Sequence, residues 1–279
     1  MKKIIFILLC HVIAVFFVAG CRNETATLSF PMARMPKVSF QGYNIPQFPT
    51  AQSQLNYAKS GFPTAEEKEA AFRFLFHMFP QNREECGDAA LHLAYMNFGF
   101  DYRFALLQDF HKAIKDYHTV IKEFKDHPQV LVKAYWYLGW IHCDLLNDKM
   151  KGLEYYWCLV QNFPDLEMGI SSPVPWVSLV YPLTVKGDHP LKNKIKTKWA
   201  SLALLEIIRH SPDNNEVFSA FDLMLNNYQK TVPAGLAIRL MLADKAKGPK
   251  AAPFVDAYLD LNIANRFLMQ EIQSAAKGY

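Results

Sequence analysis

One short pattern occurs four times along the chain, and it limits the fold more than any other feature. Each copy has an aromatic residue, two residues, two apolar residues, two residues and a second aromatic residue. The copies occupy residues 72–79, 117–124, 156–163 and 221–228. Apolar side chains at positions i, i+3, i+4 and i+7 share one face of an α-helix. Together with a low glycine content, 12 in 279 residues, the pattern predicts an all-α protein.

The third copy belongs to the most regular stretch of the chain, residues 134–164, which predicts two amphipathic helices joined by a tight turn. Small residues at Gly139 and Gly152 would let the two helices approach closely. Pro164 cannot continue a helix and would help to end the second one. Weaker versions of the same arrangement lie before and after this stretch, so the sequence is repetitive.

This stretch resembles a degenerate tetratricopeptide (TPR) repeat. The places of the TPR signature are held by Tyr135, Leu138, Gly139, His142, Gly152, Tyr156 and Pro164, with one extra residue in the turn. The resemblance implies a right-handed solenoid of TPR-like antiparallel helix pairs.

Two segments do not follow the repeat. The first, residues 165–193, contains Pro173, Pro175, Pro182 and Pro190 and cannot form one helix. Its apolar content argues against a solvated linker, so we expect an irregular insert that folds back onto the solenoid. The second, at about 252–276, predicts a long C-terminal helix that begins at Pro253 and covers the last apolar surface as a capping helix.

Residues 1–20 have the organisation of a signal peptide. Lys2 and Lys3 precede an apolar run, and small residues then lead to Cys21. The end of this segment resembles the lipobox of bacterial lipoproteins, which implies that Cys21 is acylated, for example with palmitate. The alternative is an ordinary secretory signal with a chance cysteine. Because Arg22 is not the aspartate that retains lipoproteins in the inner membrane, we expect lipid anchoring to the outer membrane at its periplasmic face.

The remainder divides into a polar, proline-rich tether at 21–53 and a TPR-like helical domain at 54–279. Thr64 and Glu67 form a capping box that predicts the start of the first helix. Three cysteines, Cys86, Cys143 and Cys158, remain beyond the lipidated one. An odd number does not indicate a disulfide framework, so we interpret them as small buried residues.

No familiar catalytic or phosphate-binding motif is present in the sequence, which predicts that the protein is not an enzyme and needs no cofactor or metal. His111 and His118 share a helical face but lack a third ligand nearby in the sequence. A basic run consists of Lys186, Lys192, Lys194, Lys196 and Lys198. It is either a solvated segment or a contact with acidic lipid headgroups.

The TPR resemblance also implies a partner-binding groove lined by the first helix of each repeat. Carried onto this chain, the groove residues are Leu91, Tyr95, Phe98, Trp136, Trp140, Cys143, Leu202, Glu206 and Arg209. Trp136 and Trp140 would form an aromatic ledge of the kind that protein-binding surfaces use. The alternative is that these aromatic residues belong to the core, under the insert or the capping helix.

Lipobox, tether and repeats together resemble the TPR lipoproteins of the Gram-negative outer membrane, over residues 64–248. Examples are the TPR subunit of the β-barrel assembly machinery and the pilotins of type IV pili. The resemblance implies a scaffold or adaptor that binds extended segments or helices of other envelope proteins, with no nucleic acid or small-molecule substrate. One alternative is a lipid-, glycan- or peptidoglycan-binding lipoprotein that uses the basic run. Another is an enzyme whose site is assembled from distant residues, for which a buried carboxylate–histidine cluster would be the sign.

Overall fold

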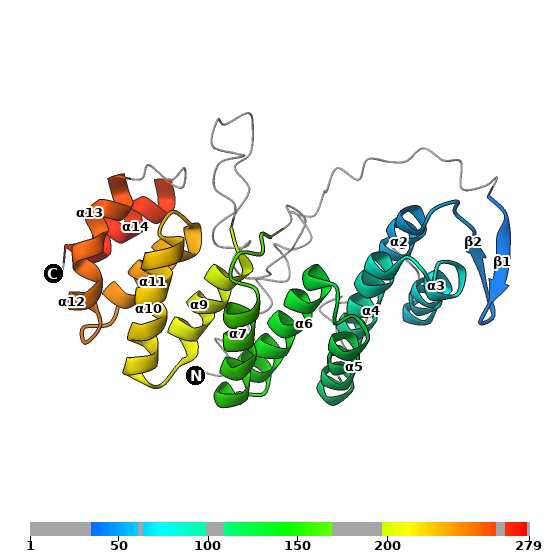
Figure 1. Ribbon diagram of the computed structural model, residues 1–279, viewed down its shortest axis with the longest axis horizontal. Coiled ribbons are helices and arrows are strands. Elements are labelled where there is room, and N and C mark those ends of the chain that lie inside the picture. Colours follow the sequence, from blue (N-terminus) through cyan, green and yellow to red (C-terminus); the bar gives the residue numbers. More distant parts are fainter. Residues whose placement is uncertain (1–34, 61–63, 99–108, 169–196, 261–265, 278–279) are drawn as a thin grey trace. The chain divides into compact units, whose positions relative to one another are not determined.

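The computed structural model describes residues 35–60, 64–98, 109–168, 197–260 and 266–277 (Figure 1). These residues are mostly helical and include one small two-stranded sheet, which confirms the all-α class. The chain divides into two compact units, Met1–Asp116 and Tyr117–Tyr279. The single helical domain expected over 54–279 is therefore two units, and each is described by itself below.

The first unit opens with a β-hairpin made of β1 (Lys37–Phe40) and β2 (Tyr43–Pro46), which pair antiparallel. Gln41 and Gly42 both have positive φ, 51° and 84°, as a two-residue hairpin turn of type I′ requires. Ile45 is fully buried, and the ring of Phe40 meets that of Phe74 edge-on at 5.3 Å.

The hairpin corrects the predicted tether of residues 21–53. Residues 37–53 belong to the folded body, because alternate strand side chains pack against the helices and supply core that the sequence pattern did not reveal. The earlier part of the tether, residues 21–34, lies outside the described residues.

Three helices follow in this unit: α2 (Ala51–Lys59), α3 (Ala65–Met78) and α4 (Arg83–Phe98). The Thr64 side chain accepts a hydrogen bond from the Glu67 backbone N–H at 3.1 Å, so the predicted cap is confirmed. It opens α3 rather than the first helix, because α2 precedes it with its own cap at Thr50. The next helix, α5 (Phe110–Glu123), crosses the boundary between the units.

The second unit is a series of packed helices. Its elements after α5 are α6 (Pro128–Trp140), η3 (Ile141–Leu145), α7 (Lys149–Asn162), α9 (Trp199–His210), α10 (Asn214–Tyr228), α11 (Val232–Leu242), α12 (Gly248–Ala251), η4 (Ala252–Phe254), α13 (Val255–Asp260) and α14 (Arg266–Ala276). Helix α6 packs on α7, α7 on α9, and α9 on both α10 and α11. Successive helices therefore lie side by side around one apolar core.

The four copies of the recurring pattern lie on α3, α5, α7 and α10. In each copy the first aromatic residue is completely buried: Phe72, Tyr117, Tyr156 and Phe221 are all 0% exposed. The prediction that each copy marks the buried face of a helix is confirmed. Burial of this kind removes a large apolar side chain from water and is the main source of stability for each helix.

The close approach predicted for Gly139 and Gly152 is also confirmed. A Cβ atom on Gly139 would lie 2.6 Å from the ring of Tyr156, and one on Gly152 would lie 2.8 Å from the carbonyl oxygen of Gly139. No side chain larger than hydrogen fits at either place, so the two glycines set the distance between α6 and α7. Helix α7 ends at Asn162, two residues before Pro164.

The two ends of the insert meet each other. The Met168 N–H donates to the Thr197 carbonyl at 2.9 Å, and the Trp199 N–H donates to the Leu166 carbonyl at 3.0 Å. The insert thus leaves and re-enters the helical core at one place. Residues 169–196, which hold most of the predicted insert, lie outside the described residues.

The expected capping helix at 252–276 is several elements instead of one. Pro253 lies in the short turn η4, and α13 and α14 are separate elements that contact each other. Proline fits the first turn of a helix but interrupts a longer one, so the chain forms short segments here. Tyr258 of α13 and Ile272 of α14 are fully buried, and α14 packs against α11.

Candidate functional site

The predicted groove residue Trp136 does not line an open surface. It is only 3% exposed, and its ring lies 5.3 Å from that of Tyr156 and 5.9 Å from that of Trp199. The alternative, that this aromatic residue is core, is therefore correct. Helix α9 packs on α7 and brings Trp199 against the Trp136 ring, so this position is covered.

The other groove residues divide by burial. Those that are buried are Leu91, Cys143, Leu202 and Glu206. Tyr95 and Trp140 are half-buried, Arg209 is exposed, and only the backbone of Phe98 is described. The predicted ledge of Trp136 and Trp140 therefore loses Trp136 to the core, whereas Trp140 is half-buried.

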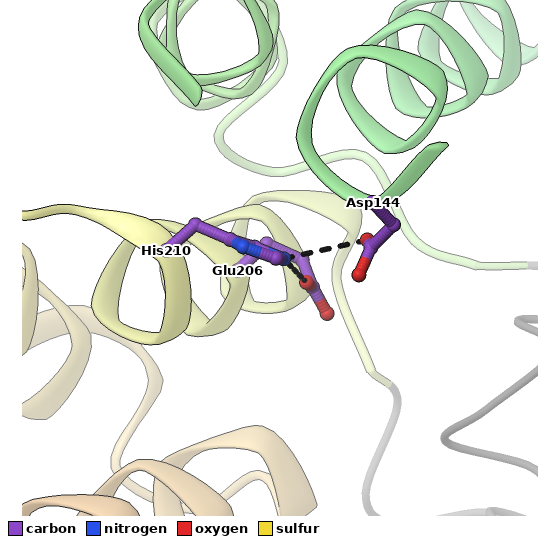
Figure 2. Close-up of side chains that lie close together, drawn as sticks. All are labelled: Asp144, Glu206 and His210. Carbon is purple, nitrogen blue, oxygen red and sulfur yellow. Dashed lines mark ion pairs between the residues drawn. The ribbon is translucent and has the colours of Figure 1, made fainter. Parts of the chain in front are cut away.

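The structure instead brings together four charged or titratable side chains in the second unit: Asp144, Glu206, Arg209 and His210. We call this set the charged cluster. Figure 2 shows Asp144, Glu206 and His210. Glu206 is completely buried and His210 is 8% exposed. It is a buried carboxylate–histidine cluster, the feature that sequence analysis named as the sign of a site assembled from distant residues.

Asp144 comes from η3, a π-helical turn at the end of α6. The Leu146 N–H donates to the Ile141 carbonyl at 2.9 Å, a five-residue spacing instead of the usual four. A π turn widens the helix by one residue and rotates the side chains that follow, and such turns are frequent at functional sites. From this turn Asp144 faces α9, as Figure 2 shows.

The other three members come from the last turns of α9. Glu206, Arg209 and His210 stand at i, i+3 and i+4, so they share one face of the helix. Arg209 and His210 also lie at the carboxyl end, where the helix dipole favours positive charge. The local sequence therefore positions one acid and two bases opposite Asp144.

Arg209 connects the two carboxylates. Its Nη1 donates to Glu206 Oε2 at 3.0 Å, and its Nη2 donates to Asp144 Oδ1. The His210 Nε2 atom lies 3.3 Å from both Asp144 Oδ2 and Glu206 Oε2. Two carboxylates, one from each of two elements, thus converge on the imidazole nitrogen.

The electrostatics of His210 follow from this arrangement. Burial would lower the pKa of His210, but the Asp144 and Glu206 carboxylates outweigh burial and raise the pKa above its usual value. Arg209 supplies one positive charge opposite the two carboxylates, and His210 supplies a second one when it is protonated. Ion pairing of this kind is how proteins tolerate buried charge.

The groups beside the cluster do not supply a nucleophile. Burial, helped by the nearby Asp144 and Glu206, raises the pKa of the Cys143 thiol to about 12. Burial also raises the pKa of Tyr156 well above its usual value. Both groups are therefore protonated near neutral pH, and neither is activated for covalent catalysis.

Sequence reasoning named Glu206 and Arg209, but for a different role, and it missed Asp144 and His210. One signal was available: Glu206 is the single acid within the apolar run of α9. A lone acid in such a run needs a buried partner. Its partners, Arg209 and His210, follow at i+3 and i+4. The sequence does not reveal that Asp144, 65 residues from Arg209, pairs with the same two side chains.

The remaining candidates have ordinary surroundings. His111 is exposed, and His118 Nε2 lies 3.1 Å from the Tyr155 hydroxyl oxygen, so these two histidines do not form a site together. Cys86 and Cys143 are buried, Cys158 is half-buried, and all three thiols are free.

The basic run is described only at its last member, Lys198. Its Nζ lies 2.5 Å from Asp165 Oδ1 and 5.8 Å from the centre of the Tyr228 ring. The lysines at 186, 192, 194 and 196, and also Cys21, lie outside the described residues.

An open groove of about 630 Å³ runs along α7 where it meets α10. We call it the α7 groove; its lining residues are Met150, Leu153, Glu154, Trp157, Cys158, Gln161 and Glu216. Met150 is 70% exposed. Trp157 is half-buried, and its Nε1 donates to Glu216 Oε1 at 2.7 Å, which holds the indole ring in the groove wall. The surface combines apolar side chains with acidic ones.

Of the helices in the described parts of the chain, none is both long enough and apolar enough to cross a lipid bilayer. Comparison of the chain with protein-family models, with curated proteins and with solved structures gave no match in any of the three.

Proposed function

We propose that the protein is a lipid-anchored, non-catalytic scaffold of the cell envelope that binds segments of partner proteins on its helix pairs. The lipobox ending at Cys21 supports the anchor, and it predicts outer-membrane attachment at the periplasmic face. The packing of successive helices side by side supports the scaffold, since stacked helix pairs give long surfaces on which other chains bind. Cys143 and Tyr156 beside the charged cluster are not activated as nucleophiles, whereas the cluster itself is the feature that the alternative of an enzyme requires.

The single observation that carries the binding role is the α7 groove. An exposed methionine and a tryptophan fixed by its own hydrogen bond are side chains that binding surfaces use repeatedly. We assign the partner site to this groove, in place of the ledge at Trp136 that the repeat resemblance implied.

The chemistry of the groove defines the partner. Glu154 and Glu216 place two carboxylates along an apolar floor. An amphipathic helix or extended segment with apolar anchors and a neighbouring lysine or arginine would match both features. A partner of this kind is a segment of another envelope protein, consistent with a scaffold in the assembly of envelope complexes.

The test is site-specific photocrosslinking in intact cells. A photoreactive residue is placed at Met150 or at Gln161 in the α7 groove, and a matched one at Lys245, an exposed residue of the same unit outside the groove. We expect one recurrent protein adduct from both groove positions and not from position 245. Equal labelling from all three positions, or none from the groove, would contradict the proposal.

The anchor needs its own test. Replacement of Cys21 by serine should abolish incorporation of labelled palmitate and release the protein from the membrane fraction. If the Cys21→Ser protein stays in the outer-membrane fraction, the lipid anchor is wrong while the groove assignment is unaffected.

A lipid-, glycan- or peptidoglycan-binding role remains the alternative from the sequence. It depends on the basic run, of which only Lys198 is described, and Lys198 already pairs with Asp165. Loss of binding at high salt would favour this role over an apolar groove, because salt screens charge and not apolar contact.

A further inference from the structure

We infer that Asp144, Glu206 and His210 form a binding site for one divalent transition-metal ion of the zinc type. Each residue offers one ligand atom, and the three ligand atoms all lie within 4.8 Å of one another. This inference is independent of the partner-binding role, and no reaction is assigned to the ion.

The spacing of the ligand atoms fits the ion. Zinc–nitrogen and zinc–oxygen bonds of about 2.0–2.1 Å at tetrahedral angles place neighbouring ligand atoms about 3.4 Å apart. The His210 Nε2 atom lies 3.3 Å from Asp144 Oδ2 and 3.3 Å from Glu206 Oε2. Two edges of the required tetrahedron are therefore already present.

The cluster also has unused ligand capacity. Asp144 Oδ2, Glu206 Oε1 and His210 Nε2 are buried and, within the described residues, make no hydrogen bond of good geometry, although Nε2 lies at ion-pair distance, 3.3 Å, from Asp144 Oδ2 and from Glu206 Oε2. A buried polar atom costs free energy unless its interactions are satisfied. Other buried atoms elsewhere share this condition, but here the three side chains converge on one place, as Figure 2 shows.

Arg209 leaves the ligand atoms available. It donates to Asp144 Oδ1 and to Glu206 Oε2, the same Glu206 oxygen that lies 3.3 Å from His210 Nε2. Asp144 Oδ2 and one oxygen of Glu206 remain for an ion, because each carboxylate oxygen can accept two interactions. Hydrogen bonds from an outer partner orient carboxylate ligands at metal sites, and Arg209 would have that role here.

The donor set selects the ion. One imidazole nitrogen with two carboxylate oxygens suits zinc and its neighbours, whereas magnesium and calcium prefer oxygen donors throughout. Three protein ligands leave a fourth position for water. A bound ion would connect the π-helical turn η3 to the carboxyl end of α9, and so join the α6–α7 hairpin to the helix that packs on it.

The experiment is calorimetric titration of the full chain, purified in detergent and stripped with a chelator, with Zn²⁺. We expect one equivalent to bind. In Asp144→Asn and in His210→Gln, affinity should fall by more than about tenfold, since loss of even an outer partner typically costs about 10–100-fold. His111→Gln and Asp148→Asn, which change exposed residues of the same types, should bind as the parent does.

Two further measurements make the outcome decisive. Circular dichroism shows whether each variant is folded; if His210→Gln is not, Asp144→Asn carries the test, because Asp144 is partly exposed at 19%. Cobalt substitution of the parent chain should give a visible spectrum without the sulfur-to-metal band of a thiolate ligand. Absence of stoichiometric Zn²⁺ binding, unchanged affinity in Asp144→Asn, or a thiolate band would each overturn the inference.

Discussion

The α6–α7 hairpin contacts α9 at two places that differ completely in chemistry. At one, Trp136 packs against both Tyr156 and Trp199 in a buried aromatic cluster. At the other, Asp144 meets the acid and bases of α9 in the charged cluster. The same pair of elements is therefore joined by apolar area in one place and by charge in the other.

The two contacts differ in what they contribute: one stabilises the packing of the helices, and the other fixes how they align. Apolar contact is non-directional and scales with buried area, so the aromatic cluster stabilises the packing without fixing a unique register. A buried ion-pair network adds little net stability, but a shift of one helix would leave a charge without a partner, at a large cost. The charged cluster thus fixes how α9 aligns with the hairpin.

The largest effect is expected at the aromatic end. Replacement of Trp136 by alanine should lower the free energy of unfolding by about 3–5 kcal/mol, through lost burial and a cavity. Urea denaturation followed by circular dichroism measures it. Trp157→Ala, which truncates the half-buried tryptophan of α7, is the matched control and should lose clearly less. Equal losses would mean that the aromatic cluster is not the core of this interface.

The second largest effect on stability is expected where α6 and α7 approach closely at Gly139 and Gly152. Gly152→Ala should destabilise the protein by about 3 kcal/mol, because the new methyl group meets the backbone of α6, which cannot move aside as a flexible side chain can. Met150→Ala, two residues earlier and exposed, should change stability little. A parent-like Gly152→Ala melting curve would show that the two helices can separate without cost.

At the charged end we expect a smaller effect. In the presence of a chelator, Glu206→Gln should cost about 2 kcal/mol, since it keeps the shape of the side chain but leaves Arg209 and His210 with a single carboxylate. Glu154→Gln removes an exposed acid from α7 and should change stability much less. If both variants melt alike, the charged cluster does not contribute to register.

The smallest expected effect is a difference in alkylation rate between the two cysteines of the hairpin. Near neutral pH the thiol of Cys143, buried and with its pKa raised to about 12, should resist alkylation. The half-buried Cys158, in the α7 groove, should react first. Peptide mapping by mass spectrometry after a short exposure to iodoacetamide identifies the modified thiol. Modification of Cys143 as fast as Cys158 would mean that the interface opens readily.

Local features of the fold were predictable because they depend on neighbours in the sequence. The cap at Thr64, the glycines 139 and 152, and the buried face that contains Phe221 each follow from residue type at helical spacing. The hairpin at 37–46 was not predicted, because its strands are four residues each and their burial comes from helices later in the chain.

The candidate site was less predictable than the fold. Glu206 was identified, but as part of an open groove. Residue spacing shows which side chains share a helical face, but it does not show which element packs on that face. Asp144 was not identified, since nothing around it in the sequence indicates a buried partner. Its position depends on the π-helical turn, which the residue pattern of α6 does not predict.

The sequence by itself determined that this chain forms amphipathic helices with aromatic, closely packed faces. Helical periodicity and residue size depend only on residues that are close together in the sequence. Only the tertiary structure decided which of those faces remain open. Trp136 and Glu206 are buried and Met150 is exposed because α9 packs on one side of the hairpin and not the other. Which side α9 packs on depends on contacts between residues far apart in the chain. The apolar area that these contacts bury together cannot be predicted from a local pattern.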